Sequence, residues 1–297
     1  MRTGTGAAWL LVALAAAAPV ARGQGTAWRP LLNGTDLSGW DTFMSKPDPA
    51  WDVPGMTRDA QGNYTADVGR NRDPLGVFKV EATDGRPAVH ITGQGFGVMT
   101  TREVFGNFHL RLQFKWGERR WGKKATAARD SGLLYFGQGD EGAVDGNWPR
   151  SVEMQIQEHD TGDLYALGTQ ISVRARAAGT PPPLLYLYDP AGAPTLFEQR
   201  APIGNRCVKL EDREKPNGQW NTLELIVLGD QSIHIVNGGV VMRLTGARKV
   251  DGTAAASLTS GRISLQTEGA ELFYRDVEIR PIKDVPAEFS RPSSPSP

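Results

Sequence analysis

Alternation of apolar and polar residues runs through most of this chain and predicts β-strands. In FHLRLQFKW, Phe108, Leu110, Leu112, Phe114 and Trp116 fall on one face, because successive side chains of a strand point to opposite sides. The intervening residues are all polar. The same period recurs in the segments 221–228, 231–236, 239–244, 261–269 and 271–282, and helical periods are almost absent. The pattern therefore predicts a chain built mainly of strands.

Turn signals between these segments favour an antiparallel arrangement. The chain has 35 glycines and 20 prolines, and the dipeptides Gly229-Asp230 and Asn237-Gly238 separate adjacent strand patterns. Strands with one apolar and one polar face bury the apolar faces against each other. We therefore expect an all-β fold, a two-sheet antiparallel β-sandwich or jelly roll. No internal boundary divides it, and the segment Ala177–Pro202 is interpreted as an insertion near a site.

One alternating segment, SVEMQIQE from Ser151 to Glu158, carries an unusual polar row. Glu153, Gln155 and Gln157 share one face, while the valine, methionine and isoleucine between them share the other. Unpaired polar groups buried in a core are costly, so the polar face should meet water, a ligand or hydrogen-bonding partners. This row is the first candidate for a functional surface, although a merely solvated face has the same pattern.

Both ends of the chain differ from the strand-rich middle. Residues 1–23 combine Arg2, an apolar run and the small-residue pattern Ala21-Arg22-Gly23, which is typical of a signal peptide and predicts a periplasmic or secreted protein. Residues 284–297 are rich in proline and serine and are predicted to form a disordered tail. Cys207 is the single cysteine, so no intramolecular disulfide can form.

Charge and motifs exclude several classes of function. The 33 basic and 33 acidic residues balance, which argues against a nucleic acid partner and favours a small, neutral one. No second apolar run is long enough for membrane insertion. The four histidines lack close pair spacing, GDEGAVDGN fits no standard calcium loop, and no phosphate-binding loop or GxSxG elbow occurs. We therefore predict no metal and no cofactor.

Several motifs, in order, resemble the 3-keto-disaccharide hydrolase family, formerly a domain of unknown function. They span about residues 28–282, which we interpret as one domain, and comprise LLNGTDLSGW from Leu31, DSGLLYFG from Asp130, WPRSVEMQIQEHDTGD from Trp148, EKPNGQWNTLEL from Glu214, HIVNGGVV from His234, GRISLQTEG from Gly261 and YRDVEI from Tyr274. The resemblance implies a concanavalin A-like double sheet with one concave face. It also implies an enzyme that cleaves 3-keto-glycosides, by elimination across C1 and C2 followed by hydration.

With this resemblance, the polar row is expected to line the concave face. Burial there would raise the pKa of Glu153 and make it a catalytic acid or base, while Gln155 and Gln157 would bind sugar hydroxyls. His159 is predicted as a second proton carrier, although a histidine beside aspartates is often only part of a solvated turn. Asp160 follows it as a substrate-binding candidate.

The resemblance places further substrate-binding residues around the same cleft. Asp130 and Ser131 are expected at its rim, where turn capping is the alternative for Asp130. Gln266 and Glu268 share one face of their strand, and the resemblance implies that Glu268 stands where many relatives have histidine. Trp148 is a candidate for sugar stacking at the rim. Tyr165 and Trp220 are further stacking candidates, with core packing the favoured alternative for Trp220.

Two other functions remain open from the sequence. A conventional glycosidase on unmodified glycans needs two carboxyl groups about 5 to 9 Å apart, and Glu153 with Glu268 would be such a pair. A non-catalytic carbohydrate-binding module would present the same polar row and bind glycans without forming a product. Side-by-side assays on native and 3-keto sugars distinguish these hypotheses.

Overall fold

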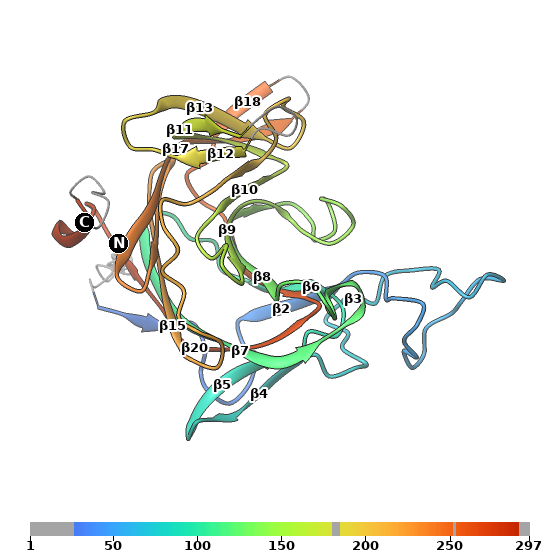
Figure 1. Ribbon diagram of the computed structural model, residues 1–297. Coiled ribbons are helices and arrows are strands. Elements are labelled where there is room, and N and C mark those ends of the chain that lie inside the picture. The colour runs from blue at the N-terminus through green and yellow to red at the C-terminus, as the bar shows by residue number, and fades with distance from the viewer. Residues whose placement is uncertain (1–26, 180–184, 252–253, 291–297) are drawn as a thin grey trace, which may run out of the picture.

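The computed structural model describes residues 27–179, 185–251 and 254–290, and it is a sandwich of two antiparallel sheets. Figure 1 shows the sheets as nested arcs, the larger wrapped around the smaller. Every strand pairing within each sheet is antiparallel, as the turn signals predicted. The prediction of a concanavalin A-like, two-sheet antiparallel sandwich is confirmed.

The larger sheet has twelve strands. Its main path runs β12-β11-β17-β16-β15-β7-β20-β5-β4, and β1, β13 and β18 pair with β20, β11 and β17. The bounds are β1 Arg29–Pro30, β4 Phe78–Thr83, β5 Arg86–Ile91, β7 Phe108–Arg120, β11 Thr169–Ala178, β12 Leu185–Tyr188, β13 Ala193–Glu198, β15 Asn221–Leu228, β16 Gln231–Val236, β17 Gly239–Asp251, β18 Ala254–Ser257 and β20 Ala270–Pro281.

The smaller sheet has eight strands in the order β14-β10-β9-β8-β19-β6-β2-β3. Short 3-10 turns, η1 and η2, follow β7 and β20. The bounds are β2 Trp40–Met44, β3 Gly69–Arg70, β6 Phe96–Thr101, β8 Asp130–Gln138, β9 Arg150–Gln157, β10 Leu164–Leu167, β14 Arg206–Cys207, β19 Arg262–Glu268, η1 Gly122–Lys124 and η2 Ala287–Phe289.

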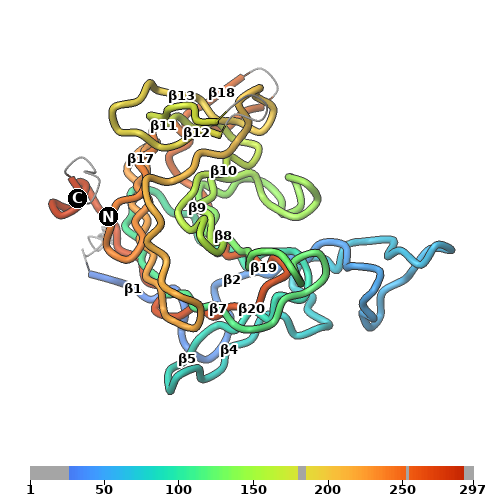
Figure 2. Tube along the Cα trace, viewed as in Figure 1, coloured from blue at the N-terminus to red at the C-terminus, as the bar shows by residue number. Residues whose placement is uncertain are grey.

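The main core lies between the two sheets. Leu110 and Leu112 of β7 meet side chains such as Val152 and Met154 of β9, all of them buried. Because strand side chains alternate, the neighbours of these apolar residues project from the opposite face of each sheet. In Figures 1 and 2, that free face of the eight-stranded sheet is concave, and the 139–149 loop lies over it.

The strands predicted from alternation agree with the structure. FHLRLQFKW forms most of β7, and its five alternate apolar residues lie in the core. Asn237 and Gly238 join β16 to β17 with positive φ angles of 48° and 79°. Positive φ at both central residues is the geometry that a two-residue hairpin turn requires.

For three segments, the structure differs from the prediction or describes only part of the predicted residues. The 177–202 segment is not a simple loop, because β12 and β13 lie within it and both pair with β11. Of the predicted tail, residues 284–290 are described, and Phe289 packs near Ile226 and Ile235. The predicted signal peptide and residues 291–297 lie outside the described residues, so export stays a prediction. No helix in the described part of the chain is long and apolar enough to cross a membrane.

Candidate active site

The polar row of β9 lies on the free, concave face of the smaller sheet. Glu153, Gln155 and Gln157 alternate with core residues, as the sequence predicted. Glu153 lies directly opposite Leu134 of β8 on one side and Tyr165 of β10 on the other. Its carboxyl group therefore lies on the sheet surface, bordered by an apolar side chain and a phenol.

Glu153 is only 4% exposed, and a glycine makes room for it. A Cβ atom at Gly132 would lie 2.0 Å from Glu153 Oε1 and 2.4 Å from Gln266 Oε1, so both side chains lie over this backbone position. Burial, together with the nearby charges of Glu268 and Asp130, raises the pKa of Glu153 well above its usual value. A hydrogen bond with Gln266 opposes this shift. Glu153 thus binds a proton more tightly than an exposed carboxyl group does.

Two more carboxyl groups share this face and are joined by one ammonium group. Lys124 Nζ contacts Asp130 Oδ2 closely and lies 3.9 Å from Glu268 Oε1. Gln157 Nε2 donates to Asp130 Oδ2 at 2.5 Å. Burial raises the pKa of Asp130, and the bonds from Lys124 and Gln157 counteract it. Burial and the charge of Asp130 raise the pKa of Glu268 to about 8.

The three carboxyl groups differ in their surroundings, which separates their protonation states. Asp130 alone has a direct ammonium partner, so it is the group that best keeps a negative charge. Glu268, with a pKa of about 8, favours the protonated form at neutral pH, and burial shifts the pKa of Glu153 in the same direction. Among the residues that the structure describes, Asp130 Oδ1 and Gln266 Oε1 are buried acceptors without a hydrogen-bond partner. The cluster therefore brings together carboxyl groups that differ in proton affinity and two acceptors that lack a donor.

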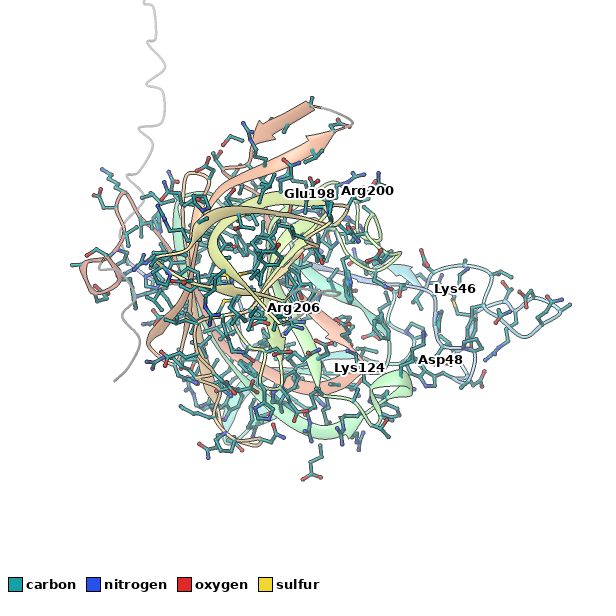
Figure 3. All side chains as sticks on the ribbon, turned by 45° about the horizontal axis from the view of Figure 1, so that its top comes forward. Lys46, Asp48, Lys124, Glu198, Arg200 and Arg206 are labelled. Carbon is teal, nitrogen blue, oxygen red and sulfur yellow. The ribbon has the colours of Figure 1, made fainter. Side chains whose placement is uncertain are left out.

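A second charged group borders the cluster beside Tyr165. The Arg206 guanidinium lies 5.6 Å from the centre of the Tyr165 ring and pairs with Asp160 at 2.9 Å and with buried Asp163 at 2.7 Å. Burial raises the pKa of Tyr165 to about 12, so its hydroxyl stays protonated at neutral pH. Figure 3 labels Arg206 and Lys124, two basic side chains of this region. Asp160 thus borders the cluster through its ion pair with Arg206, and it also lies 4.0 Å from Lys209 Nζ.

Two predicted residues do not join the cluster. The Ser131 side chain points into the core, where its hydroxyl donates to the Gln266 carbonyl at 2.9 Å and bonds the Tyr274 hydroxyl. His159 follows the end of β9, with a side chain that is 88% exposed and Nδ1 placed 3.1 Å from Asp212 Oδ2. This aspartate raises the pKa of His159. The structure gives His159 no contact with the three carboxyl groups.

The tryptophan predictions are also corrected. Trp148 is 7% exposed and packs with Val98, Leu134 and Leu167 in a small apolar cluster on the free face, so it offers little surface for stacking. Trp220 is not a core residue: its Nε1 donates to Asp84, and an arginine guanidinium, from residue 275, lies 3.7 Å from its ring centre. Tyr165 remains the aromatic neighbour of Glu153.

Sequence reasoning missed two members of the cluster. Lys124 belongs to η1, and a lysine in GKKATAARD has the appearance of an ordinary solvated charge. Gly132 did carry a signal, because a glycine inside a strand often marks a close approach of other groups. Here the approaching groups are the side chains of Glu153 and Gln266.

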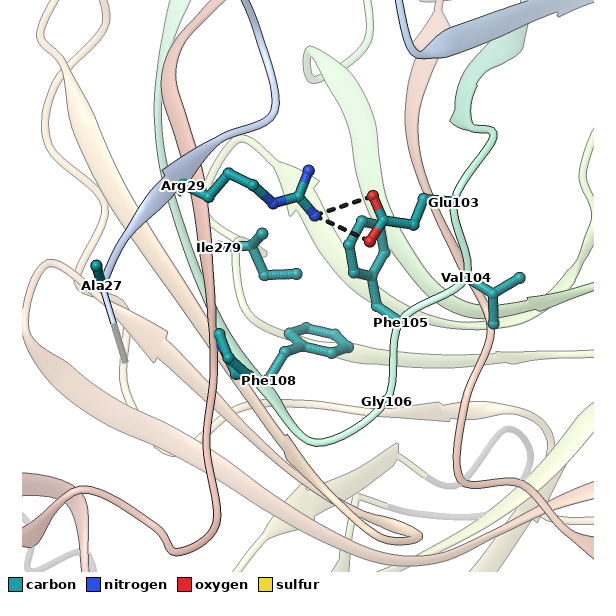
Figure 4. Close-up of a pocket in the computed structure, with 9 residues that line it drawn as sticks. Ala27, Arg29, Glu103, Val104, Phe105, Gly106, Phe108 and Ile279 are labelled. Carbon is teal, nitrogen blue, oxygen red and sulfur yellow. Dashed lines mark hydrogen bonds and ion pairs between the residues drawn. The ribbon is translucent and has the colours of Figure 1, made fainter. Parts of the chain in front are cut away.

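A pocket away from the cluster lies at the edge formed by β1 and the start of β7. It has a volume of about 320 Å³ and is lined by Phe105, Phe108, Ile279 and the ion pair of Arg29 with Glu103 (Figure 4). The charged groups in its lining satisfy each other, at 2.9 and 3.0 Å, and leave no proton carrier free. We therefore take the carboxyl cluster as the candidate active site. Within the described ranges, no group of three potential ligands is arranged to hold a metal ion.

Comparison with known proteins places the chain among carbohydrate-active proteins. The 3-keto-alpha-glucoside-1,2-lyase-like domain model matches residues 27–280. A search of curated proteins found no match. Similar solved structures include a protein of Parabacteroides distasonis assigned as a glycosyl hydrolase, with 16% identity, a TM-score of 0.44 and coverage of 86% of this chain and 94% of that one.

Two further structures show the same range of similarity. The β-glucanase of Bacillus licheniformis has 10% identity, a TM-score of 0.41 and coverage of 88% of this chain and 100% of that one. The carbohydrate-binding module CBM66 of Bacillus subtilis has 10% identity, a TM-score of 0.38 and coverage of 68% and 91%. These likenesses are too distant to bear on function.

Proposed function

The chain belongs to the family of 3-keto-alpha-glucoside-1,2-lyase-like domains, and from this premise we propose that it cleaves glycosides oxidised at C3 of the sugar. The observation that carries the proposal is the group of three carboxyl groups on the concave face, with one ammonium group: Asp130 and Glu153 are buried, and Glu268 is partly buried. Such a group supplies the base and the acid that the reaction needs.

The proposed reaction begins with an elimination. A keto group at C3 acidifies the hydrogen at C2, and a carboxylate removes that proton. The electron pair of the C2–H bond forms a C1=C2 double bond, while the C1–O bond breaks and the departing oxygen takes a proton from an acid. The products are an alcohol and an enone. Water added across the double bond then gives the free 3-keto sugar.

The surroundings of each group support an assignment of roles. Asp130, whose negative charge Lys124 stabilises, is proposed as the base, and its Oδ1, which has no hydrogen-bond partner among the described residues, is proposed as the proton acceptor. Glu153, with its raised pKa, is proposed as the acid. Lys124 and protonated Glu268 are proposed to stabilise the oxygen at C3 when it becomes negative. His159 is not needed as the second proton carrier.

The amides of the face are proposed to orient the sugar. Gln266 Oε1 is a buried acceptor without a donor, which a sugar hydroxyl can provide. Gln155 Oε1 accepts a hydrogen bond from the backbone N–H of Ile156 at 3.1 Å. This bond fixes the side chain and leaves the Nε2 amino group to donate to a ligand. Each carries neutral donors and acceptors, the pattern that binds sugar hydroxyls.

The test is Glu153→Gln, assayed with two 3-keto-glucosides that differ in leaving group. An amide cannot donate the proton, so release of methanol from the methyl glycoside should fall by about 100-fold or more. Release of p-nitrophenol, which needs little assistance, should fall much less. Glu103→Gln, in the exposed ion pair outside the cluster, is the matched control and should behave as wild type.

Three outcomes would contradict the proposal. Equal losses for both leaving groups would remove Glu153 from the acid role, and unchanged turnover would remove it from the mechanism. Cleavage of unoxidised glycosides at the same rate would favour a conventional glycosidase. Thermal unfolding of both variants shows whether any loss reflects the fold.

A further inference from the structure

A pocket of about 290 Å³ adjoins the carboxyl cluster, and the proposed function leaves it unassigned. We call it the loop pocket, because the long connection from β2 to β3 forms one wall. Figure 1 shows this connection as the excursion that extends farthest from the sandwich, and Figure 3 labels Lys46 and Asp48 on it. The residues that matter for its chemistry are Lys46, Asp48, Trp51, Phe96, Lys123 and Asn147.

The loop pocket shares its border with the cluster through two connections. Phe96 of β6 is the direct partner of Glu268 on β19, so the ring and the carboxyl group are neighbours on the same face of the sheet. Lys123 precedes Lys124, the residue that contacts Asp130 and Glu268. A ligand held at the carboxyl groups can therefore extend into the loop pocket without leaving the protein surface.

The lining of the loop pocket combines two aromatic rings with polar side chains. Trp51 and Phe96 are both partly exposed. The Trp51 ring lies over two glycines, since a Cβ atom at Gly95 would lie 3.7 Å from its Cζ3 and one at Gly122 3.6 Å from its Cζ2. Asn147 donates to the Asp145 carbonyl at 3.0 Å, which fixes its amide at the border. Aromatic faces with nearby amide and charged groups match a sugar ring, which has apolar faces and polar edges.

The wall that carries Trp51 is held in place before any ligand binds. The Trp51 carbonyl accepts from the Tyr64 hydroxyl at 2.6 Å and from Arg58. Arg58 also donates to the Pro49 carbonyl at 2.6 Å, and its guanidinium lies 4.1 Å from the centre of the buried Tyr64 ring. A loop that extends this far from the sandwich is thus cross-linked by its own side chains, which lowers the entropic cost of binding against Trp51.

We propose that the loop pocket binds the second sugar ring of a 3-keto-disaccharide, the ring that departs when the C1–O bond breaks. This inference rests on the proposed function. Trp51 and Phe96 hold the faces of this ring, and Asn147, Lys46 and Asp48 meet its hydroxyl groups. The volume of the loop pocket suits one ring and not a longer chain. The chain therefore prefers disaccharides to glycosides with a small leaving group.

The test is Trp51→Ala, assayed with 3-keto-trehalose and methyl 3-keto-α-glucoside. The measured quantity is the ratio of kcat/KM for the disaccharide to kcat/KM for the methyl glycoside, because a methyl group is too small to reach Trp51. The ratio should fall about tenfold, which corresponds to 1.4 kcal/mol. Trp220→Ala, at the residue just before β15 of the larger sheet, is the matched control and should keep the wild-type ratio. An unchanged ratio in Trp51→Ala would overturn the inference.

A second measurement separates this inference from the proposed function. If the wild-type protein cleaves no 3-keto-glycoside, the proposed function fails, and the loop pocket is then tested by calorimetry with unoxidised trehalose. Weaker binding by Trp51→Ala than by wild type and Trp220→Ala would support the loop pocket as a sugar site. Equal binding by all three proteins would refute it.

Discussion

The substitution Gly132→Ala tests whether the position of the Glu153 carboxyl group controls activity. It adds one methyl group to the middle of β8 and removes no functional group. The new Cβ atom would lie 2.0 Å from Glu153 Oε1 and 2.4 Å from Gln266 Oε1, whereas real Cβ contacts are essentially never shorter than 3.0 Å. Both clashing atoms are the ends of flexible side chains, so they can move while the strand stays in place.

The size of the effect follows from these distances. Glu153 Oε1 must move by about 1 Å or more, and a displacement of that size costs on the order of 100-fold in rate when a catalytic group loses its alignment. This loss corresponds to about 2.7 kcal/mol of transition-state stabilisation. The free energy of unfolding should change much less, because the free face can absorb the movement.

The assay is kcat/KM for release of the alcohol from a methyl 3-keto-glucoside, together with thermal unfolding. Gly117→Ala is a closely matched control, since its Cβ atom would lie 2.4 Å from Glu271 Cγ and 2.5 Å from Glu271 Oε2, outside the cluster. We expect the loss of activity in Gly132→Ala alone. Wild-type activity in this variant would refute the idea that Glu153 acts from the observed position, as would an equal loss in both variants.

Two further predictions concern the pH profile and the loop. Glu268, with a pKa of about 8, is protonated below that pH, so wild-type activity that depends on its proton should fall as pH rises through about 8. Glu268→Gln should change this alkaline limb, to which deprotonation of the proposed acid Glu153 also contributes; identical profiles would contradict the assignment. Tyr64→Phe removes a buried hydroxyl that donates to the Trp51 carbonyl at 2.6 Å and accepts from Val53 N at 2.9 Å, which should cost about 1–3 kcal/mol in urea unfolding. No change in stability would show that the loop is held by other contacts.

The alternation of side chains was enough to predict the fold class, because it depends on local geometry alone. It assigned the core face of β7 and the free face of β9 correctly, from Phe108 to Trp116 and from Glu153 to Gln157. The alternation did not predict the order of the strands within each sheet. The pairing of β19 with β8, and of β19 with β6, joins residues far apart in sequence, and no local pattern encodes those contacts.

The same alternation explains an error in the predicted site. Asp130 and Ser131 were both expected at the rim of the cleft, yet both belong to β8, where consecutive side chains point to opposite faces. Asp130 faces Lys124, and Ser131 faces Tyr274 in the core. Consistent use of the strand period would have rejected one of the two.

Residues outside the strands could not be placed from the sequence, since no period fixes their direction. His159 lies beyond the end of β9 with a φ of 69°, so the alternation of that strand no longer determines where its side chain points. Lys124 and Trp51 reach the face from a 3-10 turn and a long loop. The sheet thus supplies the carboxyl and amide groups in a predictable order, while the connections supply the groups that set their charge and bound the adjoining pocket. Differences in specificity between chains of this fold should therefore arise mainly in the connections, because a loop can change without disturbing the strand alternation that forms the core.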